Sequence, residues 1–125
     1  MNDLVKIAID AMGGDSSPKK IIAGIIHHYK MNKDSYYQIF GDKNIIVKLI
    51  NQDLPNSSFE IIHTLDVVRG TDSPLEGAKR GKKTSMWLAI QSVKEKESDV
   101  VISAGNTGAL LVIAKLNLKM IENID

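Results

Sequence analysis

Cysteine is absent from the 125 residues of the chain, and its absence excludes several kinds of chemistry. The chain can form no disulfide, offers no thiolate nucleophile and supplies no thiolate ligand for zinc. An acyl group therefore cannot be carried on a cysteine of this protein.

A strong excess of one charge is also missing, because 16 basic residues stand against 15 acidic ones and the net charge is +1. This balance gives no bulk electrostatic attraction to nucleic acid or to an anionic membrane surface. Any anionic ligand must therefore be held by a local site.

Long apolar runs do not occur either. No stretch approaches the roughly 20 apolar residues that span a bilayer. The N-terminal run over residues 4–9 lies between Asp3 and Asp10 and is too short for the apolar part of a secretory signal. We therefore expect a cytoplasmic protein. Its length, with 43% apolar and 25% charged residues, fits one globular domain or part of one.

Strand-like and helix-like patterns alternate along the chain in the order βαβαβαβα. The predicted strands are 4–9, 36–40, 59–63 and 99–103, and the predicted helices are 18–32, 43–51, 75–96 (two pieces or one bent helix) and 107–120. Such alternation is typical of an α/β fold with a parallel sheet and right-handed crossovers. Parallel sheets bind ligands at the carboxyl ends of their strands.

A glycine-rich segment, Gly105-Asn106-Thr107-Gly108, follows Ser103 at the end of the fourth predicted strand and opens the last predicted helix. The first amides of a helix lack intrahelical partners and lie at the positive end of the backbone dipole, and glycines let a phosphate approach the main chain. The segment therefore predicts a phosphate site. The same residues also fit a tight strand-to-helix turn in which Asn106 merely caps the helix.

A second glycine-rich segment, Gly13-Gly14, follows the first predicted strand and lies between two carboxylates, Asp10 and Asp15. These carboxylates could orient groups, act as a base towards dihydrogen phosphate, or bind a metal together with water. Alternatively, Asp15 caps the following helix and Asp10 accepts hydrogen bonds from loop amides. Two carboxylates do not define a metal site, so we assign no metal and no cofactor.

Other polar residues have simpler explanations. His27, His28 and His63 lack the spacing of a zinc site and are expected at the surface or at an edge. Thr84 is expected to cap a helix. Trp87, beside Met86, is expected to pack in the core.

Three segments together resemble the bacterial phosphate acyltransferase family of phospholipid synthesis. They are residues 9–15, the pair Ser85-Met86, and residues 103–109, in matching order and spacing. The resemblance extends along the chain but covers only about the first third of a family member. We therefore interpret residues 1–125 as the N-terminal part of such an enzyme.

The resemblance implies a reaction in which a fatty acyl group moves from acyl carrier protein to inorganic phosphate, giving acyl phosphate. It also implies a homodimer, a fold like that of the isocitrate and isopropylmalate dehydrogenases, and peripheral association with the membrane. Phosphate attack on a thioester needs a positioned anion and stabilisation of the oxyanion but no covalent nucleophile. The missing cysteine is consistent with such a mechanism.

The same resemblance gives the candidate site residues. Asp10 and Asn106 are the catalytic candidates. The residues expected to bind phosphate or acyl phosphate are Gly13, Gly14, Asp15, Ser85, Ser103, Gly105, Asn106, Thr107 and Gly108. Arg69 and the basic residues of 79–83 could neutralise phosphate or meet an acidic carrier protein; a basic run of this kind is also typical of a solvated helix face.

Two other functions remain open. The chain could be a catalytically incomplete remnant of the enzyme, or a small phosphate-binding module. The glycine segments match neither GxxxxGK[ST] nor GxGxxG, which disfavours a nucleotide-binding module.

Overall fold

The computed structural model describes residues 4–12, 17–67 and 84–103. Strands and helices alternate in these parts of the chain, as the sequence predicts. Their order is β1 (Val5–Asp10), α1 (Lys19–Met31), β2 (Ser35–Gly41), α2 (Lys43–Ile50), a 3-10 turn (Asn56–Ser58), β3 (Phe59–His63), α4 (Ser85–Lys94) and β4 (Val100–Ser103). The predicted helices over 75–81 and 107–120 lie outside the described residues.

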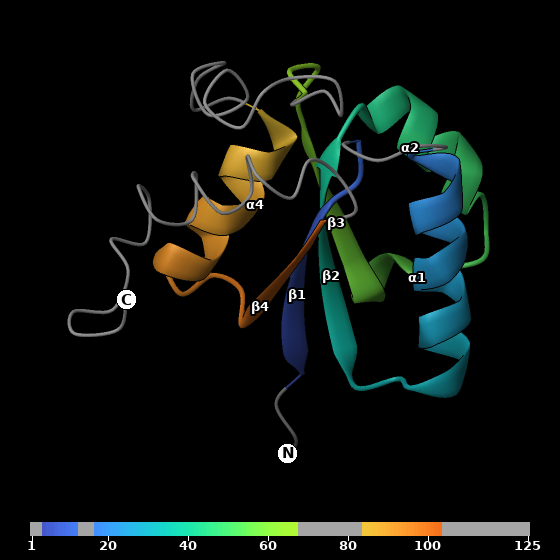
Figure 1. Ribbon diagram of the computed structural model, residues 1–125. Coiled ribbons are helices and arrows are strands. Elements are labelled where there is room, and N and C mark those ends of the chain that lie inside the picture. Colours follow the sequence, from blue (N-terminus) through green and yellow to red (C-terminus); the bar gives the residue numbers. More distant parts are fainter. Residues whose placement is uncertain (1–3, 13–16, 68–83, 104–125) are drawn as a thin grey trace.

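The four strands form one parallel sheet in the order β3-β2-β1-β4. Helices α1 and α2 lie against one face of the sheet, and α4 lies against the other (Figure 1). The predicted α/β class and the parallel sheet are thereby confirmed.

The direction of the chain across the sheet reverses at β1. The connections from β1 to β2 and from β2 to β3 run towards one edge, whereas β4 is added on the other side of β1. The carboxyl ends of β1 and β4 therefore lie side by side at the point where the strand order reverses. In open α/β sheets, ligands bind in the crevice at such a reversal.

One face of the sheet is apolar across all four strands. The register places Ile9 beside Ile39 and Ile102, and Ile39 beside Ile61. Helices α1 and α2 close this face with Ile22, Ile25, Ile46 and Ile50, all buried. At about 25 cal/mol per Å² of apolar surface, burial of such side chains is the main stabilising term of the fold.

The bounds of β3 are those predicted, and most ends of the other described elements differ from the predictions by one or two residues. Strand β1 includes Asp10, which still pairs with Phe40 of β2. Thr84 caps α4 by accepting a hydrogen bond from the Trp87 amide at 3.2 Å, which confirms its predicted role. The C-terminal end of α4 comes before Lys96, whose φ of 62° lies in the left-handed region. None of the helices in the described ranges is long and apolar enough to cross a membrane.

Gly24 and Gly41 give a paired test of this packing. A Cβ at Gly24 would meet no heavy atom within 4 Å, whereas a Cβ at Gly41 would lie 2.6 Å from Met12 Cγ and 3.0 Å from Ile46 Cδ1. Gly24→Ala should stabilise the protein by about 0.5–1 kcal/mol, because alanine favours helix and restricts the unfolded chain.

Gly41→Ala should instead destabilise the protein by about 1–3 kcal/mol, because the added methyl overpacks a buried position. Urea denaturation of the two variants measures both changes in the free energy of unfolding. The same sign of change in both variants would contradict the packing described here.

Candidate active site

Asp10 lies at the carboxyl end of β1, where the direction of the chain reverses. Asp10 is 1% exposed, and it pairs in register with Ser103, the last residue of β4. Because side chains alternate along a strand, Asp10 points to the opposite face from Ile7 and Ile9. Its carboxylate therefore faces α4.

Three donors from separate parts of the chain hold the Asp10 carboxylate. The Ser85 hydroxyl donates to Oδ1 at 2.6 Å, and the Ser103 hydroxyl donates to Oδ2 at 2.9 Å. The Met12 amide also donates to Oδ1, at 3.2 Å. Hydrogen bonds to a carboxylate are among the stronger ones in proteins, so these contacts fix the ends of β1, β4 and α4 together.

The N-terminus of α4 adds a favourable field at this point. Ser85 is the first residue of α4 and is fully buried, and its amide donates to the Asp66 carbonyl at 2.9 Å. The positive end of the helix dipole thus lies beside the Asp10 carboxylate, which is a stabilising arrangement for an anion.

A buried polar cluster positions the opposite ends of α4 and β4. The Ser92 hydroxyl contacts Gln38 Oε1 at 2.6 Å and the Ser98 hydroxyl at 2.7 Å, and Ser98 also donates to Gln38. At the start of β4, Asp99 exchanges hydrogen bonds with the Lys6 backbone. The connection between α4 and β4 is therefore anchored to β1 and β2, which fixes where Ser103 arrives.

The structure brings together three of the sequence-predicted site residues, Asp10, Ser85 and Ser103, although 75 and 93 residues separate the two serines from Asp10. The other candidates lie outside the described residues: Gly13, Gly14, Asp15, Gly105, Asn106, Thr107 and Gly108. Arg69 and the basic residues of 79–83 also lie outside them. Within the described ranges, no group of three or more His, Asp or Glu side chains is arranged to hold a metal ion.

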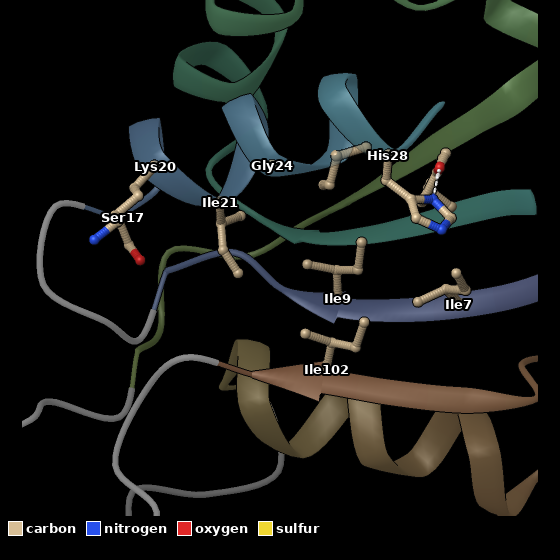
Figure 2. Close-up of a pocket in the computed structure, with 10 residues that line it drawn as sticks. Ile7, Ile9, Ser17, Lys20, Ile21, Gly24, His28 and Ile102 are labelled. Atoms are coloured by element: carbon tan, nitrogen blue, oxygen red, sulfur yellow. Dashed lines mark hydrogen bonds between the residues drawn. The ribbon is translucent and has the colours of Figure 1, made fainter. Parts of the chain in front are cut away.

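A groove on the other face of the sheet was not predicted. It has a volume of about 560 Å³ and lies between α1 and the strands β1 and β4 (Figure 2). Its lining is mostly apolar: Ile7, Ile9, Ser17, Lys20, Ile21, Gly24, Ile25, His28, Tyr37 and Ile102. The i, i+4 spacing of Lys20, Gly24 and His28 on one face of the helix is the sequence signal that could have indicated it.

His28 and Tyr37 form a polar pair at the end of the groove opposite Ser17 and Lys20. Tyr37 is almost fully buried, and its hydroxyl lies 2.6 Å from His28 Nδ1. His27, His28 and His63 are all exposed, as predicted. Trp87 is only partly buried on α4.

Replacement of Ser85 tests the carboxylate cluster. Ser85→Ala removes the shorter of the two hydroxyl contacts and should lower the free energy of unfolding by about 1–3 kcal/mol, because the buried carboxylate loses one of its three hydrogen bonds. The matched control is Ser57→Ala at an exposed serine, for which a change within about 0.5 kcal/mol is expected. Equal effects in urea denaturation would show that the cluster contributes nothing to stability.

Alkaline pH tests the burial of Tyr37. Burial raises the pKa of the Tyr37 phenol above the usual value of about 10. The folded state therefore favours the neutral phenol, and this contribution to stability is complete below about pH 10 and is lost as the pH rises further. The loss of stability between pH 8 and pH 11 should be smaller in Tyr37→Phe than in the unaltered chain. Burial and the neighbouring Glu60 also raise the pKa of Tyr36. Ionisation of Tyr36 therefore accounts for part of the stability that Tyr37→Phe still loses.

The chain is similar to a known protein family and to curated phosphate acyltransferases. Residues 5–125 match the family model described as "Fatty acid synthesis protein". A phosphate acyltransferase from Pelagibacter ubique is 78% identical over 125 residues, which are all of this chain and 37% of the relative. A phosphate acyltransferase from Nitrobacter hamburgensis is 39% identical over 127 residues, which cover 100% of this chain and 36% of the relative. One from Listeria innocua is 43% identical over 122 residues, which cover 97% of this chain and 35% of the relative. The chain thus spans little more than a third of the length of these curated relatives.

Proposed function

Because the chain belongs to the fatty acid synthesis protein family, we propose that it is the N-terminal part of a phosphate acyltransferase. The proposed reaction moves a fatty acyl group from acyl carrier protein to inorganic phosphate. The observation that carries this proposal is the junction of Asp10, Ser85 and Ser103 at the carboxyl edge of the sheet. The names of the relatives support it.

The phosphate site is proposed to lie in the loops that follow this junction. Ser103 leads through Ala104 into the segment Gly105-Asn106-Thr107-Gly108, and Met12 leads into Gly13, Gly14 and Asp15. The hydrogen bonds from Ser103 and Met12 to Asp10 support this assignment, because they bring the starts of both loops to one carboxylate. Backbone amides in such loops bind anions.

Asp10 is proposed to act as a positioning residue. Its carboxylate already accepts three hydrogen bonds and the residue is 1% exposed, so it is better placed to orient the two loops than to exchange a proton with a substrate. This choice favours the first of the four roles that the sequence leaves open for Asp10, and the hydrogen bond from the Met12 amide also agrees with the fourth, in which Asp10 accepts from a loop amide. Asn106 remains the candidate for a direct contact with the reacting groups.

In the proposed reaction, a phosphate oxygen attacks the carbonyl carbon of the acyl thioester. The new carbon–oxygen bond forms as the carbon–sulfur bond breaks, and the carrier protein leaves with its sulfur as a thiol after proton uptake. The enzyme supplies a held phosphate and donors for the tetrahedral oxyanion, which lowers the barrier without a covalent intermediate on the protein. This chemistry needs no cysteine, and the chain has none.

The complete protein is proposed to have a fold like that of the isocitrate and isopropylmalate dehydrogenases, to form a homodimer in the cytoplasm, and to associate peripherally with the membrane. The parallel sheet with helices on both faces supports the first of these statements. The alternatives are a catalytically incomplete remnant and a small phosphate-binding module.

An assay of acyl phosphate formation tests the proposed function. The purified chain is incubated with long-chain acyl carrier protein and phosphate, and acyl phosphate is trapped with hydroxylamine as the hydroxamate. We expect turnover that Gly105→Val abolishes. Asp10→Asn should lower kcat/KM for phosphate by about a hundredfold, of the order expected when a well-positioned polar group at the site is lost.

Lys48→Ala, at an exposed lysine on α2, is the control variant and should leave turnover unchanged. Absence of turnover from folded, unaltered chain would support the incomplete remnant instead. Turnover that survives both Gly105→Val and Asp10→Asn would overturn the proposed site.

A further inference from the structure

We propose that the groove between α1 and the strands β1 and β4 holds the hydrocarbon chain of the fatty acyl substrate, and that Gly24 leaves the space for it. The identity of the occupant rests on the proposed function. The location and the role of Gly24 rest on the groove itself.

The floor of the groove suits a hydrocarbon chain. Ile7 and Ile9 of β1 and Ile102 of β4 point towards α1 and lie along the groove (Figure 2). Ile102 is 48% exposed, although its partner in register, Ile9, is 3% exposed. An apolar chain that covers Ile102 would remove this surface from water, which is favourable at about 25 cal/mol per Å².

The roof of the groove has a gap at Gly24. This glycine lies within α1, where glycine is unfavourable relative to alanine by about 0.5–1 kcal/mol. A Cβ placed there would meet no heavy atom within 4 Å, so close packing within the protein does not require the glycine. An empty space above the isoleucines is what a bound chain needs.

The two ends of the groove are polar. Ser17 and Lys20 lie at the start of α1, and His28 lies near its other end (Figure 2). The helix rises about 1.5 Å per residue, so the distance along α1 between these ends is roughly 16 Å. The groove is therefore elongated, and among the described residues that line it the lysine is Lys20, at the end near the carboxyl edge. This cation complements an anionic phosphate head, with the hydrocarbon chain directed towards Tyr37.

A further segment of polypeptide is the alternative occupant. Helix α4, in the connection from β3 to β4, lies on the opposite face of the sheet from the groove, so it does not occupy the groove. A volume of about 560 Å³ also lies within the range of small-molecule sites, about 300–1,000 Å³.

Binding of cis-parinarate, a long-chain polyene fatty acid that fluoresces in apolar surroundings, tests the proposal without any need for turnover. We expect saturable binding to the purified chain, with displacement by palmitate and not by hexanoate. Gly24→Leu fills the gap and should weaken binding at least about tenfold, equivalent to about 1.4 kcal/mol. Ala23→Leu is the matched control, because Ala23 is exposed on the same helix and does not line the groove, and it should change the affinity less than about twofold.

Ile102→Asp provides a second variant if Gly24→Leu does not fold, because Ile102 is partly exposed and tolerates a polar residue better than a core position. It should also weaken binding, since it places a charge on the apolar floor. Circular dichroism and urea denaturation establish that each variant is folded.

Absence of saturable binding would overturn the proposal and favour protein as the occupant of the groove. Equal affinity in Gly24→Leu and Ala23→Leu, or in Ile102→Asp and the unaltered chain, would overturn it as well. Absence of acyl phosphate formation with intact parinarate binding would support the incomplete remnant over the active enzyme and leave the groove as a fatty acid site. The two hypotheses therefore fail separately.

Discussion

The hydrogen bonds of the Asp10 carboxylate are the interaction on which the geometry of the carboxyl edge depends. They join the end of β1 to the end of β4 through Ser103 and to the start of α4 through Ser85. The backbone ladder alone aligns β1 with β4, but it does not fix a helix on the face of the sheet. The buried serine on α4 does so, and it places the positive end of the helix beside a negative charge. The polar cluster of Gln38, Ser92 and Ser98 holds the other end of the same connection.

Side chains alternate along β1, so the two faces of the sheet at this strand have different chemical character. Ile7 and Ile9 point to the face that α1 covers, and Asp10 points to the face that α4 covers. One short strand therefore supplies both the floor of an apolar groove and the centre of a polar junction. In the proposed reaction, the substrate has the same two parts, a hydrocarbon chain and a phosphate. They would meet at the carboxyl edge, where the two faces of the sheet end.

Much of the fold could be predicted because its signals are local. The third strand was predicted with its exact bounds, since Pro55 and the polar turn before Phe59 mark its start. The parallel sheet followed from the alternation of strands and helices. The placement of Asp10 and Ser103 at the carboxyl ends of their strands followed from the same pattern, but the pairing of β1 with β4 did not. Segments that resemble a known family brought Ser85 into the same group, but the sequence could not give its hydrogen bond to Asp10. That contact depends on how α4 crosses the sheet, which is a tertiary property.

The groove escaped prediction for a different reason. In the sequence, each isoleucine of the groove is indistinguishable from an ordinary core residue, and nothing marks Gly24 as different from other positions of the helix. The groove is a space between these side chains in the folded chain, and a sequence pattern does not record such spaces. Its signal is a mismatch visible only in three dimensions. A glycine that costs helix stability, and at which an added Cβ would contact nothing, lines the same groove as an isoleucine that remains half exposed. Each is unfavourable within the described part of the chain, and a single apolar ligand between them would account for both.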